Sequence, residues 1–114
     1  MNFASDNVTG ASEEILDAIV KANLGNLMPY GNDELTAQVE RRLSDLFETS
    51  VSAFLVATGS AANSLALSVM TPPYGAVLCH WSSHIFEDEC GAPEFFTNGA
   101  RMVPLNGENG KILN

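Results

Sequence analysis

The sequence has 114 residues, of which 46% are hydrophobic and 17% charged, a composition typical of a soluble globular protein rather than a disordered or fibrous one. The formal net charge is −9 and the five basic residues are scattered, so we expect no binding to nucleic acid or to an anionic membrane. Neither a signal-peptide pattern nor a membrane-spanning apolar run is present, which indicates a cytoplasmic protein, in which Cys79 and Cys90 are expected to be free thiols.

The first fifty residues predict two amphipathic helices. Ser12 is a plausible N-cap, and apolar residues recur at helical spacing from Ile15 to Val20, so we expect a first helix that runs to about Ala22. A loop rich in Pro, Gly and Asn follows at 26–33. From Asp33 a second helix is predicted, because one stripe of it is apolar: Leu35, Val39, Leu43, Leu46 and Phe47.

From residue 51 the pattern changes to alternating strands and helices. Buried strands are predicted at Ala53–Val56 and Ala76–Cys79, and a third strand at Arg101–Leu105. A helix is predicted at Ser60–Met70 and a helix or turn at His84–Glu89. The tail NGENGKILN is predicted to be a loop. This alternation favours an α/β fold with a mainly parallel sheet, divided into a helical arm at 1–50 and the start of an α/β domain at 51–114.

The break Thr58-Gly59-Ser60 lies between a predicted strand and a predicted helix. The first amides of such a helix, together with its dipole, favour an anion such as phosphate. Gly59 would let a ligand approach the backbone, and the Ser60 hydroxyl could cap the helix or donate to a phosphate oxygen. The alternative is a tight strand-to-helix turn with a serine cap and no ligand.

The segment CHWSSHIFEDECG at 79–91 holds both histidines of the chain and allows three interpretations. His80 and His84 are four residues apart, as in some metal sites, but Trp81 stands where a zinc-protease motif needs glutamate. His84 could instead be a hydrogen-bonded structural histidine. In the third interpretation, His84 presents its ring to a bound aromatic ring in the same layer of loops as Gly59 and Ser60, so that one ligand accounts for both features.

Several collinear segments resemble the N-terminal part of the low-specificity L-threonine aldolases, especially the phenylserine aldolase branch: FASDNVTGAS, PYGNDELTAQV, TGSAAN, TPPYG and SHIFEDECGAPEFFTNGA. The resemblance covers nearly the whole chain. It implies the N-terminal portion of an aspartate-aminotransferase-type domain (pyridoxal phosphate fold type I). It also implies pyridoxal 5′-phosphate as the cofactor.

The resemblance also implies roles for individual residues. Gly59 and Ser60 match the turn that binds the cofactor phosphate, where the family usually has threonine in place of Ser60. His84 matches the histidine that stacks on the pyridine ring and takes part in proton transfer. Two further matches concern the substrate: Ser5, beside Asp6, matches a serine near the substrate carboxylate, and Tyr30-Gly31 match a loop near the site across a subunit boundary. Glu89 and Gly91 match a Glu-x-Gly pair that supports the site.

One feature of the family has no counterpart in this sequence. Family members hold the cofactor as a Schiff base on a lysine beyond residue 114, and neither Lys21 nor Lys111 matches it. The chain therefore looks like an N-terminal fragment, inactive alone, of an aldolase that cleaves a β-hydroxy-α-amino acid to glycine and an aldehyde. The family resemblance implies a homodimer or homotetramer. The alternative is a small cytosolic α/β binding or structural domain without catalytic activity.

Overall fold

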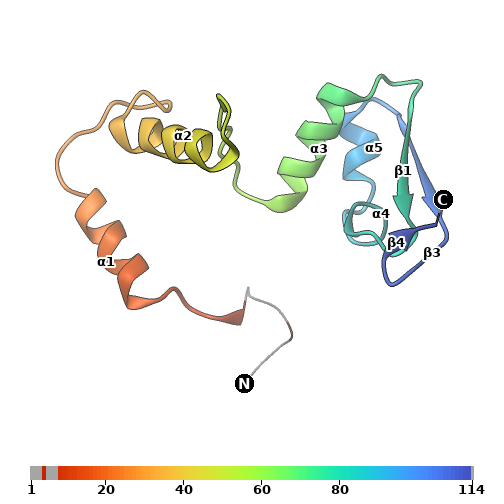
Figure 1. Cartoon of the computed structure of the whole chain (residues 1–114), viewed down its shortest axis with the longest axis horizontal. Coiled ribbons are helices and arrows are strands. Elements are labelled where there is room, and N and C mark those ends of the chain that lie inside the picture. Colours follow the sequence, from red (N-terminus) through yellow and green to blue (C-terminus); the bar gives the residue numbers. More distant parts are fainter. Residues whose placement is uncertain (1–3, 5–7, 114) are drawn as a thin grey trace. The chain divides into compact units, whose positions relative to one another are not determined.

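A computed structural model of the chain describes residue 4 and residues 8–113. The described chain divides into two compact units, residues 1–53 and residues 54–114, each of which is considered by itself. Figure 1 shows the order of the elements along the chain, coloured from red to blue. No helix among the described residues is both long enough and apolar enough to cross a bilayer.

The first unit consists of helix α1 (Glu13–Ala22) and helix α2 (Glu34–Phe47), and both agree with the predicted helices. Asp33 caps α2, because its Oδ1 accepts a hydrogen bond from the Thr36 amide at 3.0 Å and its Oδ2 accepts one from the Thr36 hydroxyl at 2.7 Å. Neither helix has a buried residue. The apolar stripes that predicted these helices are therefore not fully buried within the described unit.

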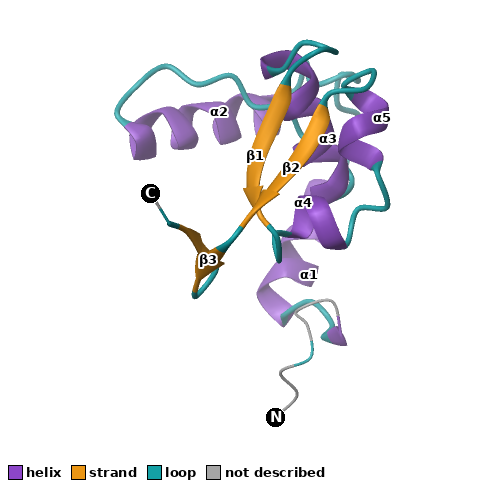
Figure 2. Cartoon of the chain, turned by 90° about the vertical axis from the view of Figure 1, so that its right-hand side faces the viewer, coloured by secondary structure: helices purple, strands orange, loops and turns teal. Residues whose placement is uncertain are grey.

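The second unit is an α/β arrangement of seven elements. These are α3 (Gly59–Met70), β1 (Ala76–His80), α4 (His84–Glu87), α5 (Ala92–Phe96), β2 (Arg101–Leu105), β3 (Gly107–Glu108) and β4 (Lys111–Ile112). β1 and β2 pair in parallel, with Ala76 opposite Arg101 and His80 opposite Leu105, and α5 packs against α3. The two views agree that α3 and α5 lie on one face of the strand pair (Figures 1 and 2).

A small core lies between the strand pair and these two helices. Its apolar members are Cys79, Ala100 and Met102, each at most 6% exposed, and Pro93, Ser64 and Thr97 are also buried. Thr97 Oγ1 donates to the carbonyl of Pro93 at 2.8 Å and accepts from the Ala100 amide at 3.2 Å, which ties the end of α5 to the start of β2. Both cysteines are free, as predicted.

The strand predicted at Ala53–Val56 is absent, which corrects the sequence analysis. Residues 53–56 have no regular structure, and the side chains of Phe54 and Leu55 are 86% and 73% exposed. An apolar run becomes a strand only when a neighbouring strand takes up its amides and carbonyls. No strand among the described residues pairs with this segment.

The tail was predicted to be a loop and is instead a short hairpin. β3 and β4 pair antiparallel, with Gly107 opposite Ile112, around the two-residue turn Asn109-Gly110. Both turn residues have positive φ, 53° and 75°, as a type I′ turn requires. Asn-Gly between two short strands is the standard signal for such a turn, so the hairpin could have been predicted from the sequence.

Candidate active site

The start of α3 leaves two backbone amides unpaired. Thr58, rather than Ser60, is the N-cap, because its Oγ1 accepts a hydrogen bond from the Ala61 amide at 3.1 Å and its carbonyl accepts one from Ala62. The helix begins at Gly59, so the amides of Gly59 and Ser60 have no hydrogen-bond partner among the described residues. These two amides and the Ser60 hydroxyl remain available to an anion.

Gly59 is not required by the local backbone. A Cβ built on Gly59 would meet no atom of the described residues within 4 Å, and the φ of Gly59 is not positive. If the turn needed glycine only for its small size, neighbouring atoms would lie close to a Cβ built at this position. The open space over Gly59 instead agrees with the close approach of a ligand to the backbone.

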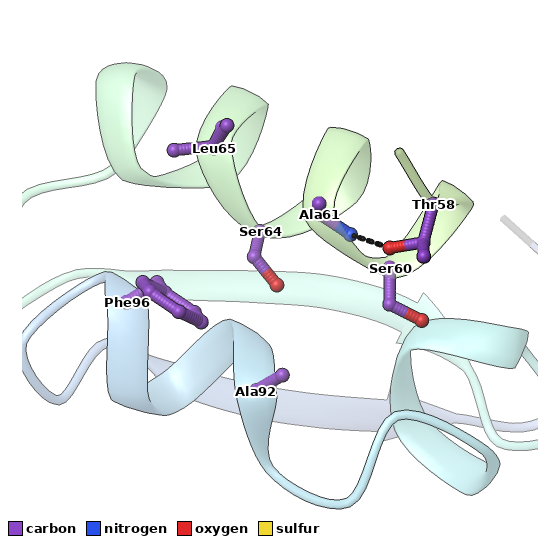
Figure 3. Close-up of a pocket in the computed structure, with 7 residues that line it drawn as sticks. All are labelled: Thr58, Ser60, Ala61, Ser64, Leu65, Ala92 and Phe96. Atoms are coloured by element: carbon purple, nitrogen blue, oxygen red, sulfur yellow. Dashed lines mark hydrogen bonds between the residues drawn. The ribbon is translucent and has the colours of Figure 1, made fainter. Parts of the chain in front are cut away.

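A cavity of about 310 Å³ lies between α3 and α5 and reaches this end of the helix. It is lined by Thr58, Ser60, Ala61, Ser64, Leu65, Ala92 and Phe96. Figure 3 shows the hydroxyl groups of Ser60 and Ser64 on the side of α3 that faces Ala92. Ser64 is 1% exposed, and its Oγ has no hydrogen-bond partner among the described residues. The cavity thus contains a buried hydroxyl whose hydrogen-bonding capacity is unused.

His84 opens helix α4, shortly after β1 ends. The start of α3 and α4 lie at the same end of the unit, towards which the β1 arrowhead points (Figure 1). The His84 side chain is 65% exposed, so much of its ring surface is open. His84 does not line the cavity between α3 and α5.

A buried carboxylate connects His84 to α3. Glu89 Oε1 lies 2.9 Å from His84 Nδ1 and accepts a hydrogen bond from Asn63 Nδ2 at 2.7 Å. The Glu89 side chain is completely buried, and its Oε2 has no partner among the described residues. The sequence analysis missed Asn63, although it lies one helical turn after Ser60, where residues three apart share a helix face.

The second histidine has different surroundings. His80 is 8% exposed, and its Nδ1 accepts the Ser82 amide at 3.2 Å and lies 2.7 Å from Ser82 Oγ. The part of the chain that the structure describes contains no group of three or more His, Cys, Asp or Glu side chains that could hold a metal ion.

Of the two predicted substrate residues, the structure describes Tyr30 alone. Ser5, like Asp6, lies outside the described residues. Tyr30 is 97% exposed and occupies a turn in which the Asn32 amide donates to the Pro29 carbonyl at 3.3 Å. Tyr30 and Gly31 have φ values of 61° and 76°, and a left-handed conformation is unusual for a bulky residue such as tyrosine.

Comparisons with known proteins identify relatives of this chain. Two curated relatives are low-specificity L-threonine aldolases: one from Pseudomonas sp. (strain NCIMB 10558), 44% identical over 96% of this chain, and one from Pseudomonas aeruginosa, 43% identical over 96%. An alanine racemase (TOXG) of Cochliobolus carbonum is 32% identical over 98% of this chain. The chain spans 32% of the length of each aldolase and 28% of the racemase.

The fold is also that of a solved relative. The threonine aldolase of Leishmania major superposes with a TM-score of 0.88 and 28% identity, over 96% of this chain and 32% of that one. The described residues therefore have the α/β fold of the threonine aldolases, the aspartate-aminotransferase type (fold type I), as predicted. The model of the beta-eliminating lyases matches residues 2–113, so the chain belongs to the beta-eliminating lyase family.

Proposed function

We propose that the protein is part of a pyridoxal 5′-phosphate-dependent aldolase that cleaves a β-hydroxy-α-amino acid, such as L-threonine, L-allo-threonine or phenylserine, to glycine and an aldehyde. The observation that carries the proposal is the similarity to two low-specificity L-threonine aldolases over 96% of the chain. Cytoplasmic location and assembly as a homodimer or homotetramer belong to the same proposal.

The residues at the start of α3 fit the phosphate group of this cofactor. The unpaired amides of Gly59 and Ser60 and the Ser60 hydroxyl are donors, and a phosphate dianion accepts hydrogen bonds only. Arg101 begins β2, at the opposite end of the strand pair from α4, so it is not placed to neutralise this phosphate. We infer that backbone amides and a hydroxyl would hold it.

The remaining roles concern the substrate and the pyridine ring. When bound, pyridoxal phosphate supplies an electron sink for the electron pair left by the breaking Cα–Cβ bond. His84 offers an exposed ring face for stacking, and its imidazole can take the proton of the substrate β-hydroxyl, directly or through a water. Ser5 and Tyr30 are proposed to lie near the substrate.

We propose that these 114 residues alone are inactive. Lys21 and Lys111 are the two lysines of the sequence, and neither matches the lysine that holds the cofactor in the threonine aldolases. The relatives are about three times as long as this chain, and we infer that the lysine is supplied by a region that corresponds to their remaining length.

The test uses the full-length protein with added pyridoxal phosphate. Glycine and the matching aldehyde should form from threonine or phenylserine, and the absorbance of bound cofactor should persist after dialysis. Because one relative is an alanine racemase, L-alanine is tested in parallel for loss of optical activity. Racemisation without aldehyde release would replace the aldolase proposal, and the absence of both reactions and of bound cofactor would end it.

A variant pair tests the phosphate contact. Ser60→Ala removes one donor to a charged group, an interaction of about 1.5–3 kcal/mol, so cofactor affinity should fall about 10- to 150-fold. Ser60→Thr keeps the hydroxyl and should retain the affinity. Equal affinity of both variants, measured by titration of the cofactor absorbance, would exclude Ser60 from the phosphate site.

A further inference from the structure

The hydrogen bonds around the two histidines determine which ring nitrogen carries the proton. A carboxylate can only accept hydrogen bonds, so the 2.9 Å contact with Glu89 Oε1 requires that His84 Nδ1 be the donor. When the ring is neutral, its Nε2 is then unprotonated and can accept a proton. In His80 the arrangement is reversed, because the Ser82 amide can only donate and Nδ1 must accept.

Glu89 is well placed to impose this choice. Its side chain is completely buried, whereas the His84 side chain is 65% exposed, so the fixed partner in this contact is the carboxylate. Asn63, on α3, donates to the same Oε1 at 2.7 Å and fixes that oxygen relative to the helix whose first amides lie at Gly59 and Ser60. The three side chains thus connect the start of α3 with the imidazole ring.

We propose that Glu89, anchored by Asn63, is a positioning residue that holds His84 in its Nδ1–H tautomer and so keeps Nε2 as the free proton acceptor. A base that must take a proton from a substrate hydroxyl needs an unprotonated nitrogen at the correct position. The Glu89 carboxylate provides this by hydrogen bonding to the opposite nitrogen of the same ring. The role of Nε2 as a catalytic base rests on the proposed aldolase function. The preference of His84 for the Nδ1–H tautomer does not.

The tautomer is measured directly by ¹⁵N NMR. The full-length protein is labelled at its histidine rings and studied without cofactor, at a pH at which the rings are neutral. We expect opposite tautomers, Nδ1–H for His84 and Nε2–H for His80, with the signals assigned by a His84→Gln variant. A wild-type His84 that is mainly Nε2–H would overturn the proposal.

Two variants then test whether Glu89 causes the Nδ1–H preference of His84. Glu89→Leu removes the acceptor, so His84 should lose its Nδ1–H preference while the His80 signals stay unchanged. Glu87→Leu is the matched control, because Glu87 is an exposed carboxylate at the end of α4, the helix that His84 opens, and no described hydrogen bond joins it to His84. Identical His84 spectra in the two variants would overturn the role of Glu89.

Because Glu89 is buried, its replacement by leucine can disturb folding, so a second and more conservative variant is used as well. Glu89→Gln keeps the size and polarity of the side chain but replaces the charged acceptor, and a smaller loss of the Nδ1–H tautomer is expected. In the active full-length protein the same variant should lower kcat with little change in KM. An unchanged tautomer in Glu89→Gln, with loss of activity, would contradict the proposal. A shifted tautomer in a protein that binds no cofactor would contradict only the aldolase function.

Discussion

At the scale of single residues, the surroundings of Gly59 bear on whether the Thr58-Gly59-Ser60 turn is only structural or binds a ligand. Its backbone needs no glycine, and the space beside it is open. Thr58 already provides the N-cap, so neither Gly59 nor the Ser60 hydroxyl is needed to cap the start of α3. The proposed binding of a phosphate group at these amides would account for this bare surface.

Gly59→Ala tests this directly. Alanine has less conformational entropy to lose than glycine, so the free energy of unfolding should stay the same or rise by up to about 1 kcal/mol. Cofactor affinity should nevertheless fall, because the added methyl group occupies the approach to the amides. Urea unfolding and cofactor titration of the same variant give both quantities. A variant with unchanged affinity would support the simple turn.

Asp33 gives a pH dependence at the start of α2. Hydrogen bonds from the Thr36 hydroxyl and then from the Thr36 amide lower the pKa of Asp33 below its ordinary value of 3.8. Since the folded-state pKa is the lower one, the cap stabilises α2 above pH 3.8 and this contribution is lost as the pH falls through the folded-state pKa. Thr36→Val should raise the Asp33 pKa towards 3.8, whereas Thr36→Ser should keep it low. A carboxyl ¹³C NMR titration measures both, and equal pKa values in the two variants would contradict the role of the hydroxyl.

At the scale of elements, the hairpin β3–β4 depends on a close backbone approach at Gly107. A Cβ on Gly107 would lie 1.9 Å from the Lys111 carbonyl oxygen and 2.8 Å from His80 Cδ2. The first clash involves backbone, which cannot move without breaking the pairing of Gly107 with Ile112. The hairpin therefore has no room for any other residue at this position.

Gly107→Ala should accordingly abolish the hairpin while β1 and β2 remain paired. Cross-strand NMR contacts between residues 107 and 112 should disappear, and those between Val77 and Met102 should persist. Glu108→Ala is the control, since Glu108 already has a Cβ on the same strand. Retention of the 107–112 contacts in Gly107→Ala would show that the turn alone holds the hairpin.

The elements differ in how far the sequence determines them. Helices α1 and α2 and strand β2 agree with prediction because their signals are local: an N-cap, an apolar period and a short apolar run between turns. The segment 53–56 carries a comparable apolar run without becoming a strand, since pairing depends on a partner distant in the chain. Helix α5 was not predicted, although Pro93 stands in its first turn, where a helix tolerates proline.

The candidate site divides in the same way. The special status of Gly59, Ser60 and His84 was inferred from residue types and from family resemblance. The link from Asn63 through Glu89 to His84 joins residues up to 26 apart, and it could only be seen once α3 and α4 were folded. Thr58 was overlooked as a cap because Ser60 offered an equally suitable hydroxyl two residues later.

At the scale of the whole molecule, exposed apolar surface coexists with a net charge of −9. Ile15, Leu16, Ile19 and Val20 of α1 are each more than half exposed, and so are Phe54 and Leu55. Apolar surface of this kind favours association, whereas like charge on every copy opposes it. Because the net charge changes with pH, the tendency of the chain to associate should depend on pH.

The 114-residue chain should remain dispersed near pH 7 and associate near pH 4.3, where protonation of carboxylates brings the net charge to zero. Light scattering across this pH range measures the change. Ile19→Glu should reduce the association, and Asn23→Glu, which adds the same charge beyond the end of α1, should reduce it less. Equal effects of the two variants would mean that charge alone, and not the apolar face, governs association.

The parallel pairing of β1 with β2 also bears on how the protein is made. Ala76 pairs with Arg101, which is synthesised 25 residues later. A ribosome adds about 5–20 residues per second, so β1 waits roughly 1–5 s for its partner to be synthesised. During that interval its amides and carbonyls form an open edge, to which a chaperone or another nascent chain can bind before β2 does.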